Sequence, residues 1–310
     1  MKRCWLSVCC VLSILLTACS APAQLVGTVT TVTTPPATTT VTTAVAKTTT
    51  SLSAVRIQGL GLYDANTLSA LYEANAHERI YPASLVKITT AYTALYYVRP
   101  DEELIVGSEL SLVKTGSSVC HIQRGHRLTL RDLVAGMMIS SGNDAAYTVA
   151  VNVARMVTQD DTMSDSAAVS FFCGLMNDLA QKLGAVNTHY VNPEGWDDPH
   201  QYTTVRDLAL LIHHAMQLPE IADAAACVSK TVSVGNGTLT FSSTNRFLYP
   251  DSEYYDERVN GFKTGSTSKA GKCLAVTATV NDKPYIVVVT NCETDTDRYK
   301  TMQTLLMRIP

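Results

Sequence analysis

Pro82-Ala83-Ser84-Leu85-Val86-Lys87 is the most informative stretch of the chain, because it places a hydroxyl and an amine three residues apart. We predict a helix over residues 84–97, which would put both side chains on one helix face with Cβ atoms about 5–6 Å apart. A lysine can activate a serine only when it is neutral, which burial and a second cation favour. The N–H of Ser84, at the helix start, would be free to stabilise an oxyanion. A serine that only caps a helix would give the same pattern.

Two further polar stretches have the composition of a catalytic site. Ser140-Ser141-Gly142-Asn143-Asp144 separates predicted helices over 129–140 and 143–157, so Ser141 and Asn143 would project from a turn. An ordinary interhelical turn capped by Asn143 is the alternative. Gly261-Phe262-Lys263-Thr264-Gly265-Ser266-Thr267 precedes an apolar run. It would place a cation and a hydroxyl at a strand edge where a peptide could pair, although a surface lysine in a polar turn is the simpler reading.

The order of the predicted elements indicates an α+β fold. Strands are expected at both ends of the domain and helices between them, so the sheet would be mostly antiparallel and the helices would form an inserted layer. We predict strands over residues 55–63, 69–74, 231–234, 238–241, 272–280 and 285–290. Besides those named above, helices are predicted over residues 165–183, 204–217 and 295–307, with a short one beginning at Pro219.

Composition excludes several classes of protein. The chain is 46% hydrophobic and 16% charged, which allows a sizeable core and rules out a wholly disordered protein. Its net charge of −3 offers no excess of basic residues to bind nucleic acid. The nine cysteines show no CxxC spacing, and His213 and His214 are adjacent on a predicted helix, pointing apart. We therefore expect no metal site and no cofactor, and a zinc peptidase is disfavoured.

The N-terminus has the features of an export signal. Lys2 and Arg3 precede an apolar run over residues 5–16, which is too short to span a bilayer comfortably. Leu16-Thr17-Ala18-Cys19 resembles the bacterial lipobox, in which cleavage precedes a lipid-bearing cysteine. Residues 1–18 would then be a signal peptide, and Cys19 would anchor the protein to the extracytoplasmic face of a membrane. A cut after Ala21-Pro22-Ala23 would instead release a soluble secreted protein.

A threonine-rich segment separates this signal from the predicted domain. Residues 28–50 contain thirteen threonines and the single charge of Lys47. With no large apolar residues alternating along it, the segment is more typical of a solvated linker than of a strand. We assign residues 19–53 to a flexible tether and residues 54–310 to one catalytic domain.

The three polar motifs occur in the order S-x-x-K, S-x-N and K-T-G, with Ser141 fifty-seven residues after Ser84 and Lys263 a further 122 on. This order resembles the superfamily of penicillin-binding proteins and serine β-lactamases. Its Ser-Gly-Asn middle motif is similar to that of the D-alanyl-D-alanine carboxypeptidases, the low-molecular-weight penicillin-binding proteins of peptidase family S11. Leu71-Tyr72-Glu73-Ala74-Asn75-Ala76 and Asn187-Thr188-His189-Tyr190-Val191-Asn192-Pro193-Glu194-Gly195 also match family segments. The resemblance covers about residues 55–306 and implies a β-lactamase/transpeptidase-like fold.

The resemblance implies a serine acyl-transfer mechanism. Ser84 would attack the carbonyl between two D-alanines of a peptidoglycan stem peptide, and Lys87 would accept its proton. Ser141 would relay a proton to the leaving amine, Asn143 would bind the substrate backbone, and Lys263 would supply positive potential.

The same resemblance implies a substrate-binding strand and covalent inhibition by β-lactam antibiotics. Thr264, Gly265 and Ser266 would line the substrate, with the Ser266 N–H completing the oxyanion hole. Thr264 and Arg298 are candidates for binding the C-terminal carboxylate, although Arg298 could equally be a solvated helix residue. Val86 and Trp196 depart from the family pattern, in which threonine and leucine are usual.

Three alternatives remain open. A D,D-endopeptidase of the same family would use the same residues on a crosslink. A serine β-lactamase would need a carboxylate to activate water, and Glu194 is the one acidic residue in a loop of plausible location. A penicillin-binding sensor would be acylated without useful turnover.

Overall fold

A computed structural model describes residues 59–310. The predicted signal peptide, Cys19, the threonine-rich tether and the first residues of the domain lie outside the described residues. Of the strand expected over 55–63, only the part from Gly59 onward can be compared with the structure.

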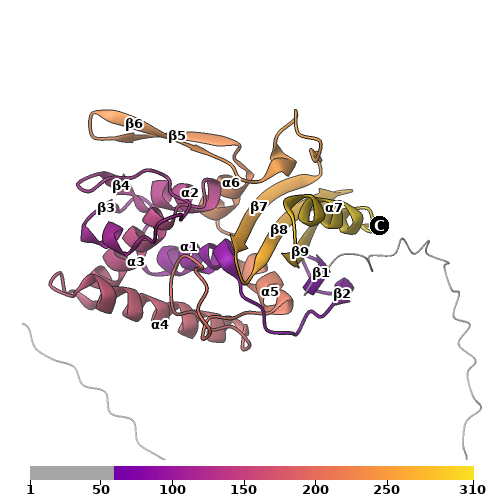
Figure 1. The fold of residues 1–310 in the computed structure, drawn as a ribbon, viewed down its shortest axis with the longest axis horizontal. Helices are drawn as coiled ribbons and strands as arrows, with labels where there is room; N and C mark the ends of the chain where they lie inside the picture. The colour runs from indigo at the N-terminus through magenta and orange to yellow at the C-terminus, as the bar shows by residue number, and fades with distance from the viewer. Residues whose placement is uncertain (1–58) are drawn as a thin grey trace, which may run out of the picture. The chain divides into compact units, whose positions relative to one another are not determined.

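A five-stranded antiparallel sheet forms the centre of the described part, in the order β2-β1-β9-β8-β7 (Figure 1). Two strands come from its N-terminal end and three from its C-terminal end, which confirms the predicted α+β architecture. The strands are β1 (Gly59–Asp64), β2 (Ala70–Ala74), β7 (Val259–Thr267), β8 (Gly271–Val280) and β9 (Lys283–Cys292). The order leaves β7 at one edge of the sheet.

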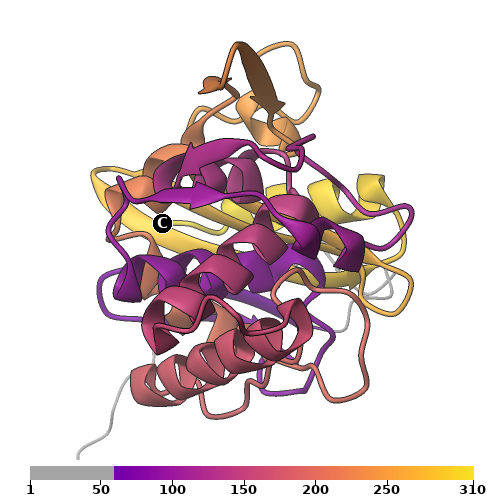
Figure 2. The ribbon, with the colours of Figure 1, turned by 90° about the vertical axis from the view of Figure 1, so that its left-hand side faces the viewer.

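The sheet is buried on both faces because successive side chains of a strand point to opposite sides. In β9, Ile286 and Val288 belong to one apolar cluster, whereas Val287 and Val289 belong to the other. The second cluster also holds Tyr299 and neighbouring residues of α7 (Asp295–Leu306), which covers that face. The other helices cover the opposite face, so the fold has three layers (Figures 1 and 2).

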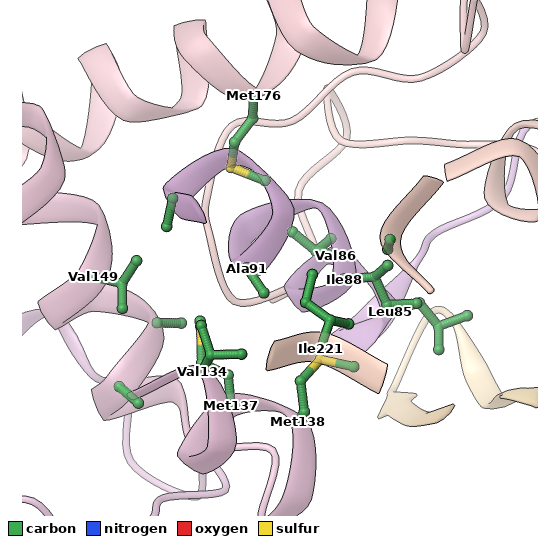
Figure 3. Packing of buried hydrophobic residues seen from close by; sticks show 14 of the residues in the cluster. Leu85, Val86, Ile88, Ala91, Val134, Met137, Met138, Val149, Met176 and Ile221 are labelled. Atoms are coloured by element: carbon green, nitrogen blue, oxygen red, sulfur yellow. The ribbon is translucent and has the colours of Figure 1, made fainter. Parts of the chain in front are cut away.

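The helical layer is built around α1 (Val86–Tyr97), most of whose residues are buried on every side. Figure 3 shows Val86, Ile88 and Ala91 of this helix among side chains from neighbouring helices. These helices are α2 (Leu130–Ile139), α3 (Asn143–Thr158), α4 (Asp165–Leu183), α5 (Val205–Ala215) and α6 (Pro219–Ala226). Lys87 therefore lies in the first turn of a helix with little access to solvent.

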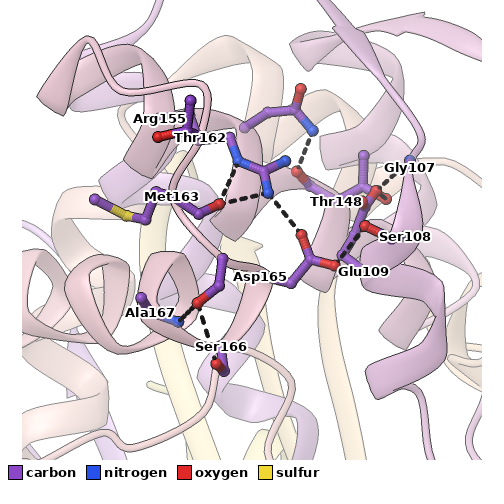
Figure 4. A network of polar contacts seen from close by, with 12 residues as sticks. Gly107, Ser108, Glu109, Thr148, Arg155, Thr162, Met163, Asp165, Ser166 and Ala167 are labelled. Atoms are coloured by element: carbon purple, nitrogen blue, oxygen red, sulfur yellow. Dashed lines mark hydrogen bonds and ion pairs between the residues drawn. The ribbon is translucent and has the colours of Figure 1, made fainter.

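A polar network fixes α3 against α4 (Figure 4). Arg155 of α3 donates to the carbonyl of Met163 at 2.7 Å and pairs with Asp165, at the start of α4, at 2.8 Å. Glu109, which lies in the 3-10 helix η2 (Ser108–Leu112), accepts a hydrogen bond from Thr148 of α3 at 2.8 Å. These contacts hold the helix that begins at Asn143.

Local signals placed most elements well. Helix α4 has the predicted bounds, and Gly184 ends it with a φ of 94°. The strands predicted over 231–234 and 238–241 form as β5 (Ser229–Val234) and β6 (Gly237–Ser242), which pair antiparallel. Asn281 and Asp282, with φ of 50° and 60°, make the tight turn between β8 and β9.

Three features differ from the sequence-based expectation. The nine-residue strand β7 was not among the predicted strands, although the third motif within it was expected at a strand edge. A small sheet of β3 (Glu103–Ile105) and β4 (Arg127–Thr129) was not predicted, since three-residue strands carry too little periodicity. Ser84 does not begin the α-helix but lies in a 3-10 turn, η1 (Ala83–Leu85), that leads into α1. A further 3-10 turn is η3 (Arg246–Leu248). Within residues 59–310, no helix is both long and apolar enough to cross a bilayer.

Candidate active site

Ser84 lies in a sharp turn at the side of a cleft of about 300 Å³. Ala83, just before it, has a φ of 48°, which non-glycine residues rarely adopt. Gly195 and Gly265 pack on this turn from two distant segments. At Gly195 the contact is so close that no side chain larger than a hydrogen fits. Tertiary contacts therefore hold Ser84 in place. The cleft is lined by Ser84, Gly116, Ser117, Ser118, Asn143, Glu194, Gly195, Trp196, Asp197, Ser266, Thr267 and Ser268.

Lys87 is fully buried and its Nζ atom reaches three oxygen atoms. It donates to Ser84 Oγ at 3.0 Å, to Asn143 Oδ1 at 2.7 Å and to the backbone carbonyl of Glu194 at 2.6 Å. The spacing of the first motif thus yields the predicted serine–lysine pair, although the serine is in a 3-10 turn. The geometry puts a potential base within hydrogen-bond distance of a potential nucleophile.

The surroundings of Lys87 favour its neutral form. Burial lowers the pKa of the ammonium to about 8, whereas the negative charges of Glu194 and Asp144 oppose this shift. At a pKa near 8, about a tenth of the lysine is neutral at pH 7. An unperturbed lysine would hold its proton almost completely at that pH.

Lys263 is the second buried cation of the site. It lies in β7, at the edge of the sheet, and its Nζ donates to the Thr264 carbonyl at 3.0 Å. Burial lowers the pKa of Lys263 well below its ordinary value, and the positive charges of Lys87 and Arg298 lower it further. The third motif thus lies in a strand, with a cation held close enough to Lys87 to interact electrostatically.

The other residues of the third motif occupy different positions along β7. Ser266 lines the cleft, whereas Thr264 is buried and its hydroxyl contacts that of Thr244 at 2.6 Å. Gly265 lies against the turn that carries Ser84, since a Cβ at position 265 would be 3.2 Å from the Ser84 nitrogen.

The second motif brings Asn143 to Lys87. Asn143 is the first residue of α3, and its Nδ2 atom donates to Glu194 Oε2 at 3.0 Å. Ser141 is buried beside it, with a φ of 59° that requires the left-handed backbone region. The buried carboxylate of Asp144 accepts hydrogen bonds from the backbone of Cys120 and Ile122 and so holds the loop next to the cleft.

Glu194 is a site residue that the sequence did not predict, beyond its mention as a possible base of a β-lactamase. Its side chain is 2% exposed, and its Oε1 atom accepts from Tyr147 at 3.3 Å. Burial raises the pKa of its carboxyl, while the charges of Lys87 and Lys114 act in the opposite direction. An acidic residue inside the mostly uncharged segment 187–195 was the available signal.

Arg298 of α7 lies against the backbone of β7 and β8. It donates to the carbonyls of Gly265 and Cys273 at 3.3 and 3.2 Å and pairs with Asp295 at 2.6 Å. Within the described residues 59–310, Arg298 is not one of those that line the cleft. Its role in binding a carboxylate stays a prediction, and the structure adds a bracing role. Over the same residues, no cluster of histidine, cysteine or acidic side chains has the geometry of a metal site.

Comparison with known proteins defines the class. The fold resembles that of the DD-transpeptidase of Streptomyces K15, with a TM-score of 0.73 at 27% identity over 81% of this chain and 96% of that one. It also resembles penicillin-binding protein D2 of Listeria monocytogenes, solved in the ampicillin-bound form, with a TM-score of 0.65, 27% identity and the same coverage.

The family model of peptidase S11, D-alanyl-D-alanine carboxypeptidase, matches residues 42–294, and the chain belongs to this family. It is 33% identical to the D-alanyl-D-alanine carboxypeptidase DacC of Escherichia coli K12, over 79% of this chain and 59% of the relative. A D-alanyl-D-alanine endopeptidase of Pseudomonas aeruginosa is 31% identical over 73% of this chain and 68% of the relative. The chain spans about three fifths of the length of the first carboxypeptidases it matches.

Proposed function

We propose that the protein is a serine-type D-alanyl-D-alanine carboxypeptidase, which removes the terminal D-alanine of peptidoglycan stem peptides through an acyl-enzyme on Ser84. The observation that carries the proposal is the 3.0 Å contact between Ser84 Oγ and the buried amine of Lys87. Membership of peptidase family S11 supports the choice of substrate.

In the acylation step, neutral Lys87 accepts the Ser84 proton as Oγ attacks the carbonyl carbon between the two D-alanines. The N–H groups of Ser84 and Ser266 are the proposed oxyanion donors, and losing one such donor typically costs about 3 kcal/mol of transition-state stabilisation. The C–N bond then breaks as Ser141 passes a proton to the departing amine and recovers one from protonated Lys87, which becomes neutral again. A proton held on Lys263 would help Lys87 to remain neutral, because like charges on the two amines disfavour each other.

Deacylation returns the enzyme to its starting state. A water molecule attacks the ester carbon and its proton passes to neutral Lys87, which returns this proton to Ser84 Oγ as the ester C–O bond breaks. The second hydrogen of Asn143 Nδ2 is available to the substrate backbone, because Glu194 takes only one. Thr264 and Arg298 are the proposed partners of the substrate carboxylate.

The test is release of free D-alanine from diacetyl-L-Lys-D-Ala-D-Ala by the purified protein, with Ser84→Ala as control. We expect release by the wild type, and loss of both release and covalent penicillin labelling in the variant. Cleavage retained by Ser84→Ala would overturn the mechanism.

A second candidate function is D,D-endopeptidase activity, which the 31% identity to the Pseudomonas aeruginosa endopeptidase favours. A crosslinked dimer of stem peptides distinguishes the two activities, because only an endopeptidase converts it to monomers. Penicillin labelling of Ser84 without turnover of either substrate would instead indicate a sensor, and fast recovery from labelling a β-lactamase.

We also propose that the protein is exported and anchored to the extracytoplasmic face of a bacterial membrane by lipid on Cys19. The support is the Leu16-Thr17-Ala18-Cys19 sequence at the end of the apolar N-terminal run. A threonine-rich tether would then let the catalytic domain reach peptidoglycan.

A further inference from the structure

The side chain of Glu194 is engaged more closely with the site than its position in a connecting segment suggests. The contact of Glu194 with Lys87 is made by its backbone carbonyl, which accepts from Nζ at 2.6 Å. Any residue at position 194 would supply that contact. The carboxylate is a separate feature, buried to 2% exposure. Burying a charged group is costly unless it is paired and hydrogen-bonded. Its specific partners therefore indicate what the carboxylate contributes.

Those partners fix the orientation of one amide. Glu194 Oε2 accepts from Asn143 Nδ2 at 3.0 Å, while Asn143 Oδ1 accepts from Lys87 at 2.7 Å. An ionised carboxylate can only accept hydrogen bonds and an ammonium can only donate them. The asparagine therefore cannot flip without losing both contacts. Tyr147 holds the other carboxylate oxygen, so the acidic group is itself fixed.

We propose that Glu194 is a positioning residue for acylation of Ser84: its carboxylate orients the Asn143 amide and, through that amide and its own negative charge, holds Lys87 in its working position beside the nucleophile. This inference rests on the proposed function in that it assigns Ser84 and Lys87 to the acylation step. It adds the residue between Pro193 and Gly195 to that step.

The charges around Lys87 determine the sign of the effect. Glu194, Asp144 and the Cys120 thiol group favour the protonated lysine, whereas Lys263 faces it as a like charge. Glu194 in turn faces Lys87, Lys114 and the Tyr147 hydroxyl. Removing the negative charge of Glu194 lowers the pKa of Lys87, so Lys87 becomes a working base at lower pH.

Three substitutions separate charge from geometry. Glu194→Gln keeps an acceptor for Asn143 but removes the charge. Glu194→Asp keeps the charge but is too short to hold the amide. Tyr147→Phe is the matched control, since it removes a contact to the carboxylate and leaves both its charge and its bond to Asn143. Thermal unfolding of each variant identifies those that fold.

The measurement is the second-order rate constant for labelling of Ser84 by a fluorescent penicillin between pH 5 and 10. The rate constant should rise with pH as Lys87 loses its proton, and we call this rise the acidic limb of the profile. In Glu194→Gln we expect the acidic limb to lie about one pH unit lower, so that this variant labels faster than the wild type at low pH. Glu194→Asp should keep the wild-type limb with a plateau about tenfold lower, and Tyr147→Phe should also keep the limb.

An unchanged limb in a folded Glu194→Gln variant would overturn the inference, as would wild-type behaviour of Glu194→Asp. Normal labelling of Glu194→Gln followed by a much longer-lived acyl-enzyme would also overturn it, because Glu194 would then act on the deacylating water. The readout needs only acylation. If the wild type is labelled but releases no D-alanine, the proposed function is contradicted. The pH dependence of labelling in the Glu194 variants still tests the positioning role of Glu194 in that case.

Discussion

Gly195 lies directly against the backbone of Ala83, so that a Cβ atom at position 195 would be 2.0 Å from the Ala83 carbonyl oxygen. Gly195 also has a φ of 98°, which side chains disfavour. The segment that carries Glu194 and the turn that carries Ser84 are therefore pressed together at the one position where only a glycine fits.

Gly195→Ala should displace the nucleophile turn. The left-handed backbone alone costs about 1–2 kcal/mol for a residue with a Cβ, and the clash adds to it. We expect at least about 2 kcal/mol of lost stability by denaturant unfolding and about a 100-fold slower labelling of Ser84, as misplacement near 1 Å can cause. Gly174→Ala is the control, because α4 leaves open space there and alanine favours helices by about 1 kcal/mol. Equal behaviour of the two variants would contradict the packing argument.

The rate of acylation should depend on the protonation of Lys87. Its pKa is lowered to about 8, and only the neutral amine accepts the serine proton. The labelling rate should therefore rise about tenfold per pH unit below pH 8 and level off above it. A stopped-flow profile between pH 6 and 10 checks this, and a profile that is flat across that range would rule out Lys87 as the titrating base.

Asp144→Asn should loosen the loop beside the cleft. The buried carboxylate accepts from the backbone N–H groups of Cys120, Ile122 and Ala145. An amide at this position turns one acceptor into a donor that faces other donors, so we expect a loss of about 3 kcal/mol in the free energy of unfolding. Asp161→Asn, at an exposed position, should change it by less than about 0.5 kcal/mol. Similar losses in both variants would argue against the assigned role.

Arg298→Gln tests the two roles considered for this arginine. If Arg298 binds the substrate carboxylate, the variant should lose the preference for peptides ending in a free acid over the matching C-terminal amides. Loss of its bonds to Gly265 and Cys273 should also lower the melting temperature. An unchanged acid-to-amide ratio of kcat/KM in a folded variant would leave only the bracing role.

Cys19→Ser should release the protein from membranes, since the proposed lipid attaches to that thiol. The measurement is the distribution of the full chain between membrane and soluble fractions, with Cys120→Ser as a matched cysteine control. Continued membrane fractionation of Cys19→Ser would contradict lipid anchoring at this residue.

Elements governed by neighbouring residues could be predicted closely. The helix α4 was bounded correctly because its apolar spacing and the terminating Gly184 are local signals. The strands on either side of the turn at Asn281 and Asp282 were placed correctly for the same reason. The short strands β3 and β4 were missed, because they form only by pairing with each other across an intervening loop.

Most residues of the site could be predicted, but only part of its geometry could. Motif order identified Ser84, Lys87 and Asn143, which the structure brings into one hydrogen-bonded group. The 3-10 turn at Ser84 depends on packing by Gly195 and Gly265, which no local pattern contains. The proposed positioning role of Glu194 likewise depends on a contact with Asn143, which lies in a distant segment of the chain. The catalytic roles stay predictions.

The left-handed backbone of Ser141, with its φ of 59°, has a consequence for laboratory evolution. Glycine would adopt that conformation without the cost of about 1 kcal/mol that a side chain incurs. A selection for heat resistance alone should therefore enrich Ser141→Gly, and the hydroxyl would disappear from the population. If Ser141 relays the proposed proton, a screen that also requires turnover of the proposed substrate would retain the serine.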